Sequence, residues 1–251
     1  MSEENDDQPV ALVTGGGTGI GSACCRRLAA EGFRVGIHYR SSEEKAEKLC
    51  AELVSSSAGG AFTIKADLMD SESLDALVKE LKSAAGRVDV LVNNAGYNVN
   101  APMLAMNLDQ YDKVASVARG TWYLTKLVLR RFMMRKGSGR IINISSVVGH
   151  TGNAGQIPYT MVKAGLDAFT KSLSAELVGR DILVNSIAPG FVATEMTDEL
   201  PDEIQEQILA KVPLGRVAQA DEIADVVAFL ATRGSYIHGS VLHVNGGMYG
   251  G

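Results

Sequence analysis

The sequence predicts an α/β fold in one domain: a doubly wound, parallel, seven-stranded sheet with helices on both faces. Short apolar runs rich in β-forming residues alternate with amphipathic stretches of helical spacing along almost the whole chain. The apolar runs show no regular polar alternation, which is typical of strands that are covered on both faces. No linker, repeat or low-complexity segment divides the 251 residues into two domains.

Seven apolar runs are predicted as strands, and six stretches between them as helices. The predicted strands span residues 10–15, 34–39, 61–66, 88–94, 140–146, 182–188 and 239–245. The predicted helices span residues 20–30, 43–54, 71–84, 111–134, 159–178 and 221–230. Right-handed crossovers keep such strands parallel, so the loops at their carboxyl ends gather at one edge and form the binding sites.

Composition and charge exclude several classes of protein. Apolar residues make up 46% and charged residues 21%, as in globular proteins, and the net charge of −5 argues against a nucleic-acid binder. No apolar run approaches the roughly 18 residues of a membrane span. We expect residues 1–8 to form a disordered acidic tail before a domain of residues 9–251. Three cysteines without metal-binding spacing indicate free thiols, no metal site and a cytoplasmic protein.

A glycine-rich segment, Thr-Gly-Gly-Gly-Thr-Gly-Ile-Gly at residues 14–21, joins the first predicted strand to the first predicted helix. Glycines there permit a tight turn and let a pyrophosphate approach backbone N–H groups at the positive end of the helix. In this position the segment predicts a Rossmann-type dinucleotide site. Its expected cofactor-binding residues are Thr14, Gly15, Thr18, Gly19, Ile20 and Gly21.

Charge after the second predicted strand favours NADP(H) over NAD(H). An acidic side chain there would bind the ribose 2′-hydroxyl and repel a 2′-phosphate. No acid occurs before Glu43, whereas Arg40 and Ser41 are placed to bind a phosphate. The alternative role for Arg40 is that of a solvated surface arginine.

The glycine spacing resembles that of the short-chain dehydrogenase/reductase family, and motifs along the chain extend the resemblance. They are Asn-Asn-Ala-Gly at 93–96, Ala-Pro-Gly at 188–190, and a serine that precedes Tyr-x-x-x-Lys. The resemblance implies an adenine contact by Asp67 and a nicotinamide contact by Thr194. It also implies a catalytic set of Ser146, Tyr159 and Lys163. The further cofactor-binding residues expected on this basis are Leu68, Asn94, Ala95, Gly96, Pro189, Gly190 and Val192, together with Tyr159 and Lys163.

The chemistry of ketone reduction requires such a set. Hydride transfer builds negative charge on the carbonyl oxygen, so a proton donor and a hydrogen bond must be present there. Tyr159 and Lys163 are four residues apart and share one face of a helix. A neighbouring ammonium can lower the pKa of a tyrosine by roughly 1 to 3 units. We therefore expect Lys163 to activate Tyr159 as the acid, and Ser146 to hold the substrate oxygen.

One position departs from the family pattern. Most members carry an asparagine six residues after an aromatic residue in the helix that follows the fourth strand, where it supports a proton-relay water and a helix irregularity. Six residues after Tyr111 this chain has Val117, which offers neither a donor nor an acceptor. Three alternatives follow: an enzyme whose relay uses other groups, a slower enzyme, or a cofactor-binding subunit with weak catalysis.

The substrate prediction depends on further resemblance. The segments 140–166, 188–197, 212–231 and 239–251 are similar to those of 3-oxoacyl-[acyl-carrier-protein] reductases of fatty-acid synthesis. This implies an NADPH-dependent reduction of a 3-oxoacyl thioester, a substrate lid at about 191–212, and a homotetramer formed through the helices at 111–134 and 157–178. A basic patch beside the active-site mouth is expected to dock the acidic carrier protein, through Arg135, Lys136 and Arg180; the alternative is that they are solvated ends of helices. Another ketone is the alternative substrate.

Overall fold

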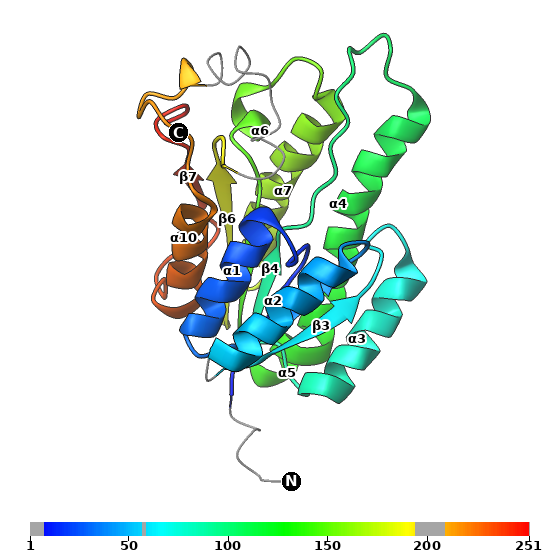
Figure 1. Cartoon of the computed structure of the whole chain (residues 1–251), viewed down its shortest axis with the longest axis vertical. Coiled ribbons are helices and arrows are strands. Elements are labelled where there is room, and N and C mark those ends of the chain that lie inside the picture. Colours follow the sequence, from blue (N-terminus) through cyan, green and yellow to red (C-terminus); the bar gives the residue numbers. More distant parts are fainter. Residues whose placement is uncertain (1–7, 57–58, 194–208, 251) are drawn as a thin grey trace.

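The computed structural model describes residues 8–56, 59–193 and 209–250, and within them the predicted sheet is confirmed. Its seven strands are all parallel and lie in the order β3-β2-β1-β4-β5-β6-β7 (Figure 1). The strands are β1 (Val10–Val13), β2 (Arg34–Tyr39), β3 (Ala61–Lys65), β4 (Val90–Asn93), β5 (Ser138–Ile144), β6 (Asp181–Pro189) and β7 (Val241–Val244). The strand order reverses between β1 and β4, and a doubly wound sheet opens a crevice for a ligand at such a point.

The helices follow the predicted alternation. They are α1 (Gly19–Ala30), α2 (Glu43–Ser56), α3 (Ser71–Ala85), α4 (Leu108–Val128), α5 (Met134–Lys136), α6 (Val148–Thr151), α7 (Ile157–Glu176) and α10 (Ala220–Thr232). A π-helical turn, η2 (Leu129–Met133), connects α4 with α5, so the single helix predicted over 111–134 is divided. Helix α6 was not predicted because four residues are too few to show helical periodicity. None of the described helices combines the length and apolar character that a membrane span needs.

Two apolar cores cover the two faces of the sheet. Helices α1, α2 and α10 contribute to the first core, and α3, α4 and α7 contribute to the second. Successive strand residues alternate between them: Val90 and Val92 belong to the first core, and Leu91 belongs to the second. This arrangement explains the continuous apolar runs of the sequence, because both faces of each strand are buried.

Amide side chains form a buried ladder below the carboxyl edge of the sheet. Asn93 and Asn143 are register partners on β4 and β5, and the Asn93 amide donates to Asn143 Oδ1 at 2.8 Å. The same amide donates to Thr125 of α4 at 3.0 Å, while the Asn143 amide donates to Thr170 of α7 at 2.8 Å. The ladder thereby links α4 to α7 through the middle of the sheet.

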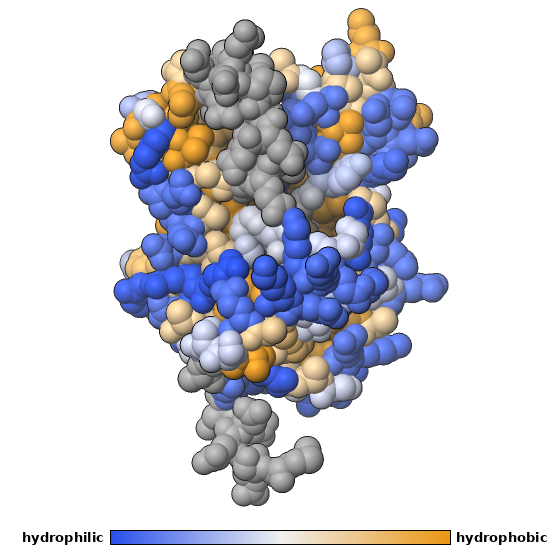
Figure 2. All heavy atoms as spheres, viewed as in Figure 1, coloured by the Kyte–Doolittle hydropathy of each residue, from blue (hydrophilic) through white to orange (hydrophobic). Residues whose placement is uncertain are grey.

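The hydropathy of the exposed side chains differs between the two ends of the molecule. Hydrophilic side chains cover α1, α2 and α3, whereas apolar side chains are exposed near the carboxyl edge (Figure 2). Exposed apolar residues in the β4–α4 loop and in the segment before α10 include Met103, Leu104 and Leu214.

Candidate active site at the carboxyl edge of the sheet

The glycine-rich loop packs tightly against the first turn of α1. Gly15 has a φ of +63°, in the left-handed region that favours glycine. A Cβ on Gly21 would lie 2.1 Å from the Gly15 carbonyl oxygen, so no larger side chain fits there. The N-cap residue Thr18 makes no side-chain hydrogen bond to the first turn of α1, which leaves backbone N–H groups at this positive helix end available to an anion.

Thr14 and Asn94 hold this loop to the end of β4. The Asn94 side-chain amide donates to the carbonyl oxygens of Thr14 and Gly15 at 2.9 and 3.2 Å. The Thr14 hydroxyl oxygen accepts from the backbone N–H groups of Asn94 and Ala95 at 2.9 and 3.0 Å. These contacts fix the crevice between β1 and β4.

His38 is a second anchor of the loop that no sequence motif predicts. Its Nδ1 accepts from the Gly15 N–H at 3.1 Å, and its Nε2 lies 3.1 Å from the Ala66 carbonyl oxygen. The ring is therefore neutral, with its proton on Nε2. Burial lowers the pKa of His38 from 6.5 to about 4. A histidine within an otherwise apolar strand gives no sign of its partners, because these come from two other loops.

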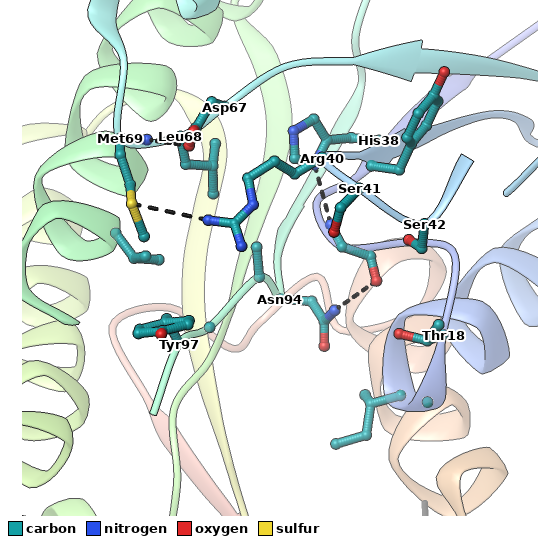
Figure 3. Close-up of a pocket in the computed structure, with 17 residues that line it drawn as sticks. Thr18, His38, Arg40, Ser41, Ser42, Asp67, Leu68, Met69, Asn94 and Tyr97 are labelled. Carbon is teal, nitrogen blue, oxygen red and sulfur yellow. Dashed lines mark hydrogen bonds between the residues drawn. The ribbon is translucent and has the colours of Figure 1, made fainter. Parts of the chain in front are cut away.

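A cavity of about 440 Å³ opens above these contacts (Figure 3). Most of the predicted cofactor-binding residues line it, namely Gly15, Thr18, Gly19, Ile20, Arg40, Ser41, Asp67, Leu68, Asn94, Ala95 and Gly96. Residues that line it but were not predicted are His38, Tyr39, Ser42, Met69 and Tyr97. Thr14 and Gly21 support the cavity from behind without lining it. The loops that follow the four neighbouring strands β1, β2, β3 and β4 thus all line this one cavity.

Pro189, Gly190 and Val192 do not line this cavity. The Pro189 carbonyl oxygen accepts from the Val147 N–H at 2.8 Å, and Gly190 donates to Val244 at 3.0 Å. They therefore lie behind the loop that carries Ser146. Thr194 and most of the predicted lid at 191–212 fall outside the described residues.

Charge around the cavity suits a phosphate beyond the end of β2. The Arg40 side chain extends across the cavity to Met69, with Nη1 3.9 Å from the sulfur (Figure 3). Among the described residues no carboxylate pairs with Arg40. The first acid after β2, Glu43, accepts from the Tyr39 hydroxyl at 2.9 Å and from Lys65 at 3.1 Å. Glu43 is thus engaged with Lys65, and among the residues that the structure describes Arg40 is the cation at this cavity without a carboxylate partner.

Ser146, Tyr159 and Lys163 come together at the same edge. Strand β5 ends at Ile144, so Ser146 lies in the loop after the strand rather than at its end as predicted. Helix α7 begins at Ile157 with Pro158 in its first turn, which presents Tyr159 and Lys163 on one face. Lys163 Nζ lies 5.4 Å from the centre of the Tyr159 ring.

Lys163 joins this set to the larger cavity. Its Nζ donates to the Ile144 carbonyl oxygen at 2.7 Å, and a Cβ on Gly96 would lie 3.7 Å from it. A second cavity of about 350 Å³ between α4 and α7 is lined by Tyr159 and Lys163, and it shares Gly96 and Val117 with the first. A molecule bound in the first cavity would therefore approach Lys163 at Gly96.

Burial dominates the electrostatics of this set. The pKa of Tyr159 is raised by burial, and a hydrogen bond with Ser146 opposes that rise. The pKa of Lys163 is lowered to about 8 by burial, and the charge of Asp167 opposes the fall. The expected lowering of the Tyr159 pKa by Lys163 is therefore not found: burial raises this pKa, and Ser146 is the group that favours the phenolate.

Comparison with known proteins identifies the family. A short-chain dehydrogenase/reductase family model, described as enoyl-(acyl carrier protein) reductase, matches residues 15–249. The chain belongs to the short-chain dehydrogenase/reductase family. Membership makes it an oxidoreductase with a nicotinamide cofactor.

Relatives of this short-chain dehydrogenase/reductase include proteins named 3-oxoacyl-[acyl-carrier-protein] reductase FabG. Those of Staphylococcus aureus (strain Mu50) and Aquifex aeolicus are each 43% identical to it, over 95% and 96% of this chain and 97% of each relative. That of Haemophilus influenzae is 43% identical over 96% of this chain and 98% of the relative. The similarity therefore extends over nearly the full length of all three proteins.

Val117 of this short-chain dehydrogenase/reductase lies between the two cavities. It is 8% exposed and belongs to the second apolar core. Helix α4 is α-helical through this position, and the irregular turn comes only at η2. The site therefore places an apolar side chain where the family pattern predicts an amide.

The predicted docking residues do not lie beside the active site. Lys136 ends α5 and donates to Asp89 at 2.5 Å, and Arg180 directly precedes β6. Arg135 lies beside Lys136 in α5. Residues that precede parallel strands lie at their amino ends, opposite the edge that carries Tyr159, and Figure 1 shows α5 at the far end from α6. The expectation that Arg135, Lys136 and Arg180 flank the active-site mouth is wrong for that reason.

Proposed function

We propose that this protein catalyses NADPH-dependent reduction of a 3-oxoacyl thioester, linked to acyl carrier protein, to the 3-hydroxyacyl product. The observation that carries the proposal is the convergence of Ser146, Tyr159 and Lys163 beside a cavity that Arg40 lines. The names of the full-length relatives support the substrate class.

The residues around the larger cavity fit a phosphorylated dinucleotide. The first turn of α1 would hold the pyrophosphate, because its N–H groups are uncapped and Gly21 permits close approach. Arg40 and Ser41 would bind the 2′-phosphate, and Asp67 with Leu68 would contact the adenine. When bound, NADPH supplies the hydride.

The catalytic roles follow from the groups at the second cavity. Tyr159 would donate its proton to the substrate oxygen as negative charge develops there, while the Ser146 hydroxyl donates a hydrogen bond to the same atom. The buried Lys163 ammonium would stabilise the resulting phenolate. The Ser146 hydroxyl favours the Tyr159 phenolate in the absence of substrate, and its single proton would turn to the substrate oxygen when a ketone binds.

The test is a spectrophotometric assay of NADPH oxidation with a 3-oxoacyl thioester, run in parallel with an enoyl thioester because of the family model's description. We expect Tyr159→Phe to abolish turnover while NADPH affinity stays nearly unchanged. Tyr236→Phe, at a fully exposed tyrosine, is the matched control and should keep wild-type turnover. Near-normal turnover of Tyr159→Phe would refute the assignment. Tight NADPH binding without oxidation by any ketone would favour a cofactor-binding subunit.

We further propose a homotetramer assembled through α4 and α7, in the cytoplasm. Trp122 of α4 and Met161 of α7 are 50% and 54% exposed, and both line the groove between these helices. Apolar side chains exposed on such a groove are typical of a subunit interface. Light scattering of wild type and Trp122→Glu tests this, since the charge should weaken assembly; an unchanged mass would count against the groove as the interface.

A further inference from the structure

A charged cluster lies directly behind Lys163, on the side away from Tyr159. Asp167 follows Lys163 by one turn of α7 and is only 4% exposed. Its Oδ1 accepts from the Ser186 hydroxyl of β6 at 2.5 Å, and its Oδ2 lies 2.9 Å from His150 Nε2 of α6. This carboxylate is therefore built into the protein between three elements.

Two rings complete the cluster. The His243 ring of β7 lies 4.7 Å from the His150 ring, centre to centre. The centre of the Tyr249 ring lies 5.0 Å from that of His150 and 4.9 Å from that of His243. The ionisable groups that act on Asp167 are thus Lys163 on its own helix, His150 from α6 and His243 from β7, and Tyr249 from the C-terminal segment packs on the two histidines.

The backbone of β5 brings the cluster close to Lys163. Lys163 Nζ donates to the carbonyl oxygen of Ile144, and the Ser186 hydroxyl that holds Asp167 lies 3.3 Å from the carbonyl oxygen of the adjacent Asn143. An ammonium buried this deeply is costly unless a negative charge is near. Asp167 is the charged group that acts on Lys163 in the described part of the chain.

The cluster is not explained by stability alone. Asp167 Oδ2, His150 Nε2 and His243 Nδ1 are buried and have no well-aligned hydrogen-bond partner among the described residues, although the first two lie within ion-pair distance. Each such atom costs roughly 1 to 3 kcal/mol relative to a satisfied one. Apolar side chains at these positions would remove that cost, so another requirement favours the charged groups.

We infer that Asp167 is a positioning residue for the reaction, whose carboxylate keeps Lys163 protonated, and that His243 makes this support depend on pH. The inference rests on the proposed ketone reduction. Asp167 touches neither cavity and acts through Lys163. When His243 takes up a proton, its positive charge offsets that of Asp167 and weakens the attraction between Asp167 and the Lys163 ammonium.

The first experiment compares pH profiles of NADPH oxidation for wild type and Asp167→Asn. The Lys163 pKa of about 8 should fall by about one unit without the carboxylate. The protonated fraction at pH 8 would then drop from about one half to about one tenth, a roughly fivefold loss of turnover, with less than about a 1.2-fold change at pH 6. Asp167→Glu should restore the profile of wild type.

A matched control is Asp181→Asn, which removes the same charge from the opposite end of β6, where Asp181 is 64% exposed and pairs with Arg140. It should leave the profile unchanged. An equal loss of turnover at pH 6 and pH 8 in Asp167→Asn, or no rescue by Asp167→Glu, would overturn the inference, because a structural defect lowers activity at every pH.

The second experiment does not need activity. Burial and the neighbouring His150 lower the pKa of His243, and Asp167 opposes this. By NMR titration, Asp167→Asn should move the His243 midpoint to lower pH and His150→Asn should move it to higher pH. Absence of both shifts would refute the cluster. If both shifts occur but no thioester is reduced, the proposed function fails while the electrostatic cluster stands.

Discussion

Acidification should destabilise this protein through His38, because the fold accepts only the neutral ring. His38 is 2% exposed, and its pKa is lowered from 6.5 to about 4. Its stabilising contribution is therefore complete above pH 6.5 and is lost as the pH falls from 6.5 to 4, because the unfolded chain binds the proton first. At 1.36 kcal/mol per unit, the whole loss is about 3 kcal/mol, of which about 2 kcal/mol is reached at pH 5.

The assay is urea unfolding of wild type and His38→Asn at pH 7.5 and pH 5, at equal protein concentration because assembly alters apparent stability. The asparagine can still accept from the Gly15 N–H but does not titrate. It should lower stability at pH 7.5 by about 1 to 3 kcal/mol, since the Ala66 carbonyl loses its partner. Between the two pH values, wild type should lose about 2 kcal/mol more than the variant. Equal losses would refute a buried neutral His38.

Three further predictions concern the cofactor and the relay. Gly21→Ala should weaken NADPH binding at least about tenfold, because its methyl group would lie 2.1 Å from the Gly15 carbonyl oxygen; Gly165→Ala, whose methyl group meets nothing within 4 Å, should bind normally in the same fluorescence titration. Arg40→Ala should reduce the ratio of kcat/KM for NADPH over NADH by about tenfold, the value of a charge-assisted hydrogen bond, and an unchanged ratio would mean that Arg40 is merely solvated. Val117→Asn should raise turnover if proton supply is limiting, since valine offers no donor or acceptor between the cavities; an unchanged rate would show that other groups already suffice.

Local patterns predicted what depends on a single element. The Tyr159 and Lys163 pair was predictable because two residues that are four positions apart on a helix share one face. The sheet was predictable because continuous apolar runs require cover on both sides. Strand ends were less certain: the strand predicted to reach Ser146 ends at Ile144, although Ser145 and Val147 still donate backbone hydrogen bonds to β6.

Side-chain contacts between different helices, strands and loops could not be predicted from the sequence. The pairing of Asp167 with His150 joins α7 to α6, and the bond between His38 and Gly15 joins β2 to the first loop. The number of residues between the two members of each pair does not indicate that they are in contact. The expected place of the docking residues was wrong for a different reason, since proximity to a strand in sequence does not place a residue at the edge where that strand ends. Arg180 precedes β6 and so lies at its start.

The amide ladder of Asn93 and Asn143 has a consequence for how the chain reaches this fold. A slip of one residue between β4 and β5 would place Asn93 opposite an isoleucine and separate it from Asn143, so their hydrogen bond would be lost. Such a slip would also displace Thr125 and Thr170, and with them the two helices that enclose Tyr159. Only the register that assembles the active site satisfies these four side chains, so the ladder makes misaligned sheets less stable than the native one.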